Sequence, residues 1–282
     1  MMLTLFTPAY NRAHTLPRLY ESLLAQTCFD FEWLIIDDGS TDATAEAVKA
    51  FTGGGNFPVR YIYKENGGKH TAHNRALEEA RGDWFLCLDS DDTLTPTAVA
   101  ELLSAAKDLP ENTGIAAGKT DLSGNSLSQF PQGRSFAKMH ALQGEFAYAF
   151  PTKWAKQFPF PVFPGERFLG ECVVYDRMDT RGQMYLLPKA VMPCEYQAGG
   201  YSADFSRLMK QNPQGFCLFF AQRVDLASNW RQRLITAGKY RCFRMIGGKN
   251  APVYSGAHPF SVAAAWPLGL IFRLYYKLLR GF

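Results

Sequence analysis

Three aspartates crowd four consecutive positions in the first third of the chain. Asp89, Asp91 and Asp92 directly follow the apolar stretch of residues 84–88. Carboxylates this close repel one another unless protons or a cation compensate them. Mg²⁺ and Mn²⁺ take few protein carboxylates and complete their shells with water and phosphate oxygens. The cluster predicts a divalent-cation site for a diphosphate, whereas an acidic helix start ahead of Pro96 would need only one aspartate.

A second acidic pair, Asp37 and Asp38, precedes Gly-Ser-Thr. This pattern is typical of a turn that caps a helix, and an aspartate there could also accept from a base N–H or a ribose hydroxyl. Lys69 and Arg75 lie near the start of a predicted helix, where their charges and the helix dipole would offset phosphate. The types and spacing of these residues suit a nucleotide site.

The elements that must position these residues alternate between short apolar strands and helices. We expect strands at 3–6, 31–36, 59–63, 84–88 and 115–120, and helices from 15, over 42–51, over 71–80 and from 96. This order predicts a parallel sheet covered by helices. Ligands bind beyond the carboxyl ends of such strands. The polar residues that follow four strands should therefore meet in one cleft: Thr7, Pro8, Tyr10, Asn11; Asp37, Asp38, Gly39, Ser40; Asn66, Gly67, Gly68, Lys69; Asp89, Ser90, Asp91, Asp92.

The rhythm of strands and helices changes in the second half of the chain. Residues 123–125 read Ser-Gly-Asn, a turn signal, and Pro159, Pro161 and Pro164 disfavour a regular helix. From residue 202 onward the pattern is mainly helical. We predict three parts: a nucleotide-binding half over 1–107, an irregular acceptor-binding half over 108–201, and a helical region over 202–282.

Composition excludes several classes of protein. The 282 residues are 47% hydrophobic with a net charge of +4, and no basic stripe indicates a nucleic-acid partner. Six scattered cysteines form no CxxC pair, which fits a reducing cytoplasm. No segment has the ~20 uninterrupted apolar residues of a membrane span. Residues 274–280 mix Leu and Tyr with Lys277 and Arg280, a pattern that suits either a bilayer surface or packing on the core.

Four motifs in this order resemble the family 2 glycosyltransferases. They are TPAYNR at 7–12, DDGSTD at 37–42, NGGKHTAHN at 66–74 and LDSDD at 88–92. FPFPVFPGERFLGE at 158–171 and YQAGGYS at 196–202 resemble a bacterial subgroup of that family, of the type that builds polysaccharides and glycans. The resemblance implies the α/β GT-A fold, a Rossmann-like, mostly parallel sheet flanked by helices.

The resemblance also implies roles for individual residues. Glu171 would be the catalytic base, although Cys172 stands where the family has a second acid, and Asp176 is the alternative base. Asp89 and Asp91 would match the DxD motif. Asp91, helped by Asp92, would hold Mn²⁺ or Mg²⁺, with direct contact by Asp89 left open. The nucleotide-binding residues would be Thr7, Pro8, Tyr10, Asn11, Asp38, Asn66, Lys69, Asn74, Asp89 and Ser90.

The activity implied is inverting transfer of a sugar from a nucleotide diphosphate sugar, with UDP favoured, to a hydroxyl of a glycan or glycolipid. We expect a cytoplasmic protein, peripheral at the inner face of the membrane. One alternative is a phosphatase of the haloacid dehalogenase type, because residues 89–93 also fit its DxDxT nucleophile loop. Another is a protein that binds nucleotide sugars without turnover. The sequence leaves the sugar, the acceptor and the oligomeric state open.

Overall fold

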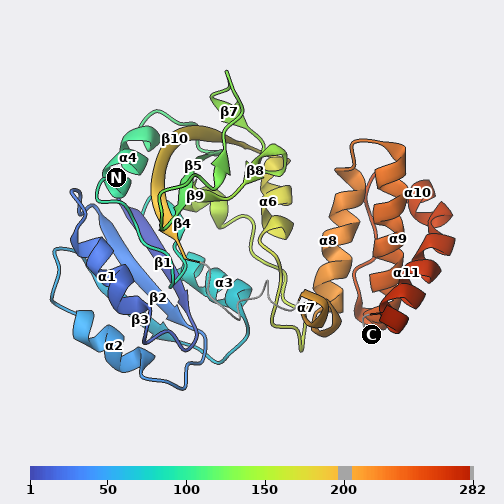
Figure 1. The fold of residues 1–282 in the computed structure, drawn as a ribbon, viewed down its shortest axis with the longest axis horizontal. Helices are drawn as coiled ribbons and strands as arrows, with labels where there is room; N and C mark the ends of the chain where they lie inside the picture. The colour runs from blue at the N-terminus through green and yellow to red at the C-terminus, as the bar shows by residue number, and fades with distance from the viewer. Residues whose placement is uncertain (196–204, 280–282) are drawn as a thin grey trace. The chain divides into compact units, whose positions relative to one another are not determined.

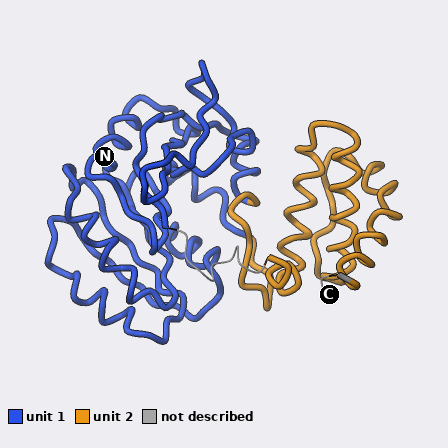
Figure 2. The backbone as a smooth tube through the Cα atoms, in the orientation of Figure 1, with its two compact units in different colours: residues 1–160, 174–197 blue, residues 161–173, 198–282 orange. Residues whose placement is uncertain are grey.

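The computed structural model describes residues 1–195 and 205–279. The chain divides into two compact units (Figure 2). Unit 1 consists of residues 1–160 and 174–197, and unit 2 of residues 161–173 and 198–282. Each unit has its own packed interior.

Unit 1 is built on one large sheet with the strand order β3-β2-β1-β4-β9-β5-β10-β7 (Figure 1). A second sheet pairs β6 with β8. The strands are β1 (Leu3–Ala9), β2 (Phe31–Asp37), β3 (Val59–Tyr63), β4 (Trp84–Cys87), β5 (Thr113–Asp121), β6 (Ser128–Gln129), β7 (Phe136–Ala137), β8 (Gln143–Gly144), β9 (Phe146–Pro151) and β10 (Gln183–Cys194).

Most neighbours in the large sheet are parallel. β1 runs parallel to β2 and β4, β2 to β3, and β5 to β10. β9 is inserted antiparallel between β4 and β5, and β7 lies antiparallel at the edge beside β10. The prediction of a mostly parallel sheet is confirmed, and the carboxyl ends of β1, β2, β3 and β4 lie at the same edge.

Helices cover both faces of this sheet because its strands are apolar on both sides. In α1, Leu16, Leu19 and Leu23 are buried at helical spacing. They join a core with Leu5 and Trp33. The opposite face of β1 meets α3 through aromatic side chains there. The helices of unit 1 are α1 (Leu16–Leu24), α2 (Thr44–Phe51), α3 (Lys69–Glu79), α4 (Ala98–Ala106), η1 (Met139–Ala141) and α5 (Thr152–Ala155), while α6 (Cys172–Asp179) begins in unit 2.

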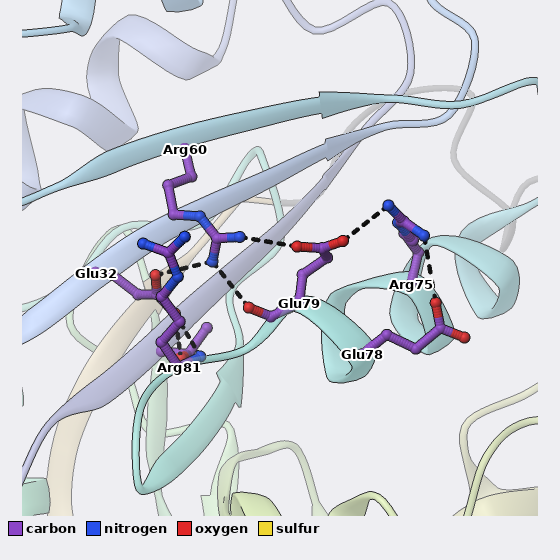
Figure 3. Close-up of polar contacts among 7 residues, drawn as sticks. Glu32, Arg60, Arg75, Glu78, Glu79 and Arg81 are labelled. Atoms are coloured by element: carbon purple, nitrogen blue, oxygen red, sulfur yellow. Dashed lines mark hydrogen bonds and ion pairs between the residues drawn. The ribbon is translucent and has the colours of Figure 1, made fainter.

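A buried ion pair secures the amino ends of the strands, away from the carboxyl-end loops. Glu32 on β2 is 1% exposed, and one of its carboxylate oxygens lies 3.1 Å from a guanidinium nitrogen of Arg60 on β3 (Figure 3). Arg60 also pairs with Glu79 at the end of α3, at 2.9 Å. Arg75 pairs with Glu79 from the other side, at 2.7 Å. Arg75 therefore serves this network, contrary to the expectation that it offsets phosphate.

Unit 2 is helical, as the sequence predicts for its C-terminal part. Its core packs Phe216 of α8 against Phe243 of α9, and Tyr276 of α11 also contacts Phe243. α9 touches both α8 and α11. The elements are α7 (Phe205–Gln211), α8 (Pro213–Asp225), α9 (Trp230–Ile246), η2 (Gly248–Asn250), α10 (Pro259–Ala264) and α11 (Trp266–Leu279).

The structural division differs from the three parts expected from sequence. No break falls near residue 107, because β5, β9 and β10 complete the same sheet as β1 to β4. The functional division into nucleotide-binding and acceptor-binding halves stays a prediction.

Candidate functional site

The loops after β1 and β2 are fastened together by Asn11. Its side-chain oxygen accepts from the amide of Thr41 at 2.8 Å, and its own amide donates to the hydroxyl of Ser40 at 2.8 Å. Asn11 has φ of 55° and is the one non-glycine residue with positive φ in the described chain. Asparagine tolerates this conformation better than most residues. The strained backbone is held in place by the bonds between the two loops.

Asp38 organises the loop after β3. Its carboxylate is 5% exposed and accepts from the amides of Gly67 at 2.9 Å and Gly68 at 2.7 Å. The ammonium of Lys64 donates to the same carboxylate at 2.5 Å. Charge-assisted bonds of this kind are stronger than neutral ones. Asp38 therefore holds the NGG segment against the end of β2 and leads it into α3.

Gly39 makes this close approach possible. Its φ is +85°, and a Cβ placed there would lie 2.8 Å from the backbone nitrogen of Asn66. Glycine is the residue that tolerates both the positive φ and the contact. The neighbouring Asp37 is 1% exposed and has a structural role, since it accepts from the amide of Ser40 and the hydroxyl of Tyr61.

The loop after β4 is joined to α3 by an ion pair between Lys69 and Asp89. The Nζ of Lys69 lies 2.7 Å from one carboxylate oxygen and 2.9 Å from the other. Burial would raise the pKa of Asp89, but the nearby cations, with Lys69 foremost, outweigh burial and hold that pKa below its usual value. Asp89 is therefore ionised and compensated.

Asp91 and Asp92 have contrasting surroundings. Asp92 is 5% exposed, and its carboxylate lies 3.1 Å from Nζ of Lys119 on β5. Asp91 is half-buried, and no side chain of the described residues pairs with it. Burial and then the charge of Asp89 raise the pKa of Asp91. Of the three acidic side chains, Asp91 is the one with no cationic partner among residues 1–195 and 205–279.

Arg12 draws the first loop to the fourth. Its guanidinium donates to the hydroxyl of Ser90 at 3.1 Å, and its charge helps to lower the pKa of Asp89. Its amide donates to Thr44 at the start of α2, at 2.9 Å. The four loops predicted to converge are therefore cross-linked to one another.

Other predicted nucleotide-binding residues have varied surroundings. Thr7 is fully buried inside β1, where its hydroxyl accepts from the indole of Trp33 at 3.0 Å. Asn74 bonds both the amide and the carbonyl of Phe160, each at 2.8 Å. Tyr10 is 47% exposed. Pro8, near the end of β1, and Asn66, in the loop after β3, are half-buried.

The two candidate bases lie on either side of the division between units. Glu171 is half-buried in unit 2, immediately before α6. Asp176 lies within α6 in unit 1 and is 4% exposed. The whole YQAGGYS motif, residues 196–202, falls outside the described residues.

The described residues fit a divalent cation only in part. Among residues 1–195 and 205–279, no group of three His, Cys, Asp or Glu side chains is arranged to hold a metal ion. The half-buried and uncompensated Asp91 fits a cation that takes one carboxylate and fills its shell with diphosphate oxygens and water. Asp92 fits less well as a direct ligand, because Lys119 occupies its carboxylate.

Sequence reasoning missed three cations at this site, namely Arg12, Lys64 and Lys119. Arg12 belongs to the TPAYNR motif, and Lys64 directly follows β3, so the position of each after a strand could have singled it out. Lys119 had no such signal, because it lies within β5, far along the sequence from the aspartates. Burial opposes the charge of Lys119, but the neighbouring groups, with Asp92 foremost, together outweigh burial and raise the pKa of Lys119.

Comparisons with known proteins agree with this architecture. Residues 4–165 match the model for Glycosyl transferase family 2. Over 98 residues the chain is 43% identical to the chondroitin synthase of Pasteurella multocida. This match covers 35% of this chain and 10% of that protein. The matched segments make up between 10% and 64% of the lengths of three curated relatives.

Two solved structures share the fold. S. aureus TarS in complex with UDP-GlcNAc has a TM-score of 0.62 and 18% identity, covering 98% of this chain and 92% of that one. The mannosyltransferase PcManGT of Pyrobaculum calidifontis, in complex with GDP-Man and Mn²⁺, has a TM-score of 0.58 and 18% identity, covering 99% and 77%. Both have the GT-A fold. The family match spans the DxDxT segment at residues 89–93, which removes the phosphatase alternative. The chain belongs to glycosyl transferase family 2.

Proposed function

We propose that this protein transfers a sugar from a nucleoside diphosphate sugar, UDP-linked by preference, to a hydroxyl of a glycan or glycolipid. The observation that carries the proposal is the cross-linking of four loops at the carboxyl ends of β1 to β4. These cross-links bring three features to one edge of the sheet: the Asp38 carboxylate with the loop amides that it binds, the Lys69–Asp89 pair and the uncompensated Asp91. The names of a chondroitin synthase and a UDP-GlcNAc complex among similar proteins support the donor class.

The chain's own residues divide the work in this proposal. Tyr10, Asn11, Asn66 and Ser90 border the nucleotide, with Thr7, Pro8 and Asn74 shaping the elements behind it. Lys69 and Arg12 supply positive charge near the diphosphate. Glu171, or Asp176 in its place, takes the proton of the acceptor hydroxyl as that oxygen attacks C1, which inverts the configuration.

We also propose that a divalent cation, Mn²⁺ or Mg²⁺, is held by Asp91, with Asp92 behind it. Such a cation would neutralise charge on the departing diphosphate. The support is the lack of any cationic partner for Asp91 among the described residues. A glycolipid acceptor would place the protein at the cytoplasmic face of a membrane.

The test is donor hydrolysis and transfer, measured with and without Mn²⁺, on the native protein, Asp91→Asn and Glu171→Gln. A transferase should lose turnover in Glu171→Gln while keeping donor affinity, whereas Asp91→Asn should lose the stimulation by Mn²⁺. Asp176→Asn serves as the comparison for the base. Donor binding without turnover by the native protein would instead identify a nucleotide-sugar-binding protein.

A further inference from the structure

Helix α11 packs one of its faces inside unit 2. Gly269 is buried on this face, where an added Cβ would lie 2.6 Å from the Cβ of Arg241 on α9. A Cβ added at Gly238 of α9 would lie 3.1 Å from the ring of Phe272, and Tyr276 contacts the ring of Phe243. This face accounts for the contact between α11 and α9.

The opposite face of α11 is also apolar, but it is exposed. Successive helical residues are ~100° apart, so the exposed positions fall on one side of the helix. They are Trp266 at 47% exposure, Leu270 at 52%, Ile271 at 61%, Leu274 at 56%, Tyr275 at 42% and Leu278 at 70%. The neighbouring α10 adds Phe260 at 89%. We call these seven residues the outer face. A surface helix ordinarily turns polar residues to water, and a contiguous exposed apolar patch marks an interaction site.

The charge of residues 205–282 indicates which partner the outer face could bind. Residues 205–282 contain twelve Lys or Arg and a single acidic residue, Asp225, whereas residues 1–204 contain eighteen basic and twenty-five acidic residues. Three of the cations border the outer face. Arg273 and Lys277 lie on α11, and the guanidinium of Arg241 lies 6.0 Å from the ring centre of Trp266. An apolar surface bordered by cations complements an anionic lipid bilayer.

We propose that the outer face docks on an anionic membrane surface. Its aliphatic side chains would enter the acyl boundary, Trp266 and Tyr275 would lie at the level of the headgroups, and Lys277 would extend to lipid phosphate. The helix would lie on the bilayer, because fourteen residues span ~21 Å whereas the hydrocarbon core is ~30 Å thick. No helix of the described residues has the length and hydropathy to cross a membrane.

A second copy of the chain fits this face less well than lipid does. Self-association through the outer face would bring two strongly basic regions together, and like charges at an interface oppose binding. Membrane docking does not depend on sugar transfer, so the outer face can be tested whether or not the protein is a transferase.

The experiment is flotation of the full chain with vesicles of phosphatidylcholine, alone or mixed with phosphatidylglycerol. We expect binding to the mixed vesicles that weakens as salt rises, and little binding to phosphatidylcholine alone. Leu274→Glu should weaken binding roughly tenfold or more, because it removes apolar area and adds a charge of the wrong sign. Leu122→Glu is the matched control. Leu122 is 57% exposed in unit 1, the charge change is the same, and binding should be unchanged.

A second variant, Lys277→Gln, should weaken binding to mixed vesicles about fivefold and leave the fold intact. Circular dichroism and donor hydrolysis in solution should be the same for both α11 variants as for the native protein, which separates loss of docking from loss of folding or catalysis. Equal effects of Leu274→Glu and Leu122→Glu would overturn the proposal. The proposal would also be overturned if vesicles failed to bind and the outer face instead mediated dimerisation, or binding of an acidic protein, that Leu274→Glu abolishes.

Discussion

The Nζ of Lys119 lies 3.1 Å from Oδ2 of Asp92, and both side chains are largely buried. This pair crosses from β5 to the loop after β4 and compensates one of three adjacent carboxylates. Asp89 is compensated separately by Lys69. Two of the three negative charges are thus balanced by the protein itself, and Asp91 is the carboxylate that the proposed divalent cation would neutralise.

Replacing Lys119 by Met should lower the free energy of unfolding by about 3 kcal/mol, because it leaves the carboxylate of Asp92 buried without its partner. Lys119→Met/Asp92→Asn should recover much of that loss. Lys189→Met is the control, since the Lys189–Glu101 pair has the same 3.1 Å separation but Lys189 is 57% exposed, and its loss should cost below about 1 kcal/mol. Urea unfolding measures all three variants, and equal losses in the two single variants would contradict this account.

Asp38→Asn should weaken donor binding at least roughly tenfold, because a carboxamide cannot accept from Gly67, Gly68 and Lys64 as the carboxylate does. The measurement is calorimetric titration with nucleotide. Asp121→Asn provides the comparison, since Asp121 also accepts several bonds but in an exposed turn. If Asp38→Asn left the affinity for nucleotide unchanged, Asp38 and the loop that it holds would not be part of the nucleotide site.

Gly39→Ala should destabilise the protein by more than the roughly 1 kcal/mol of a positive-φ alanine, because the new methyl group would also strike Asn66. Gly53→Ala separates the two effects. Gly53 has φ of +83° and open space around the Cβ position, so only the conformational cost applies. Thermal unfolding should rank Gly39→Ala below Gly53→Ala, and the reverse order would contradict the close approach of the two loops.

His70 should make stability depend on pH. It is 3% exposed, and burial lowers its pKa below the ordinary 6.5. The unfolded chain therefore binds the proton more readily, so this contribution is complete above pH 6.5 and is lost as the pH falls towards the lower folded pKa. Urea unfolding between about pH 7.5 and 5.5 should show a larger loss for the native protein than for His70→Gln. Parallel losses would show that His70 has no such role.

The sequence predicts the central elements of unit 1 well, because their signals are local. Strand β3 falls at residues 59–63 as expected, and the helix predicted over 71–80 is α3, which begins two residues earlier at Lys69. The convergence of four polar loops follows from parallel topology alone.

Thr7 shows where local reasoning stops. We expected the first strand to end at residue 6, which would place Thr7 in a loop, but β1 continues to Ala9. Side chains alternate along a strand, so Thr7 shares the face of Leu5 and points at Trp33 in the core. Lys119 could not be found either, because its pairing with Asp92 depends on the placement of β5 in the sheet, which long-range contacts decide.

The antiparallel strand β9 affects how the protein can be truncated and how it folds during synthesis. Residues 84–86 of β4 pair with residues 149–151 of β9, more than sixty positions later in the chain. A fragment that stops near residue 107 would contain all four cross-linked loops and yet leave β4, an apolar central strand, paired with β1 on one side only. Bare edges of this kind invite aggregation. During synthesis, residues 1–107 must therefore wait for distant residues before their sheet is complete, and chaperones that shield strand edges should bind them in that interval.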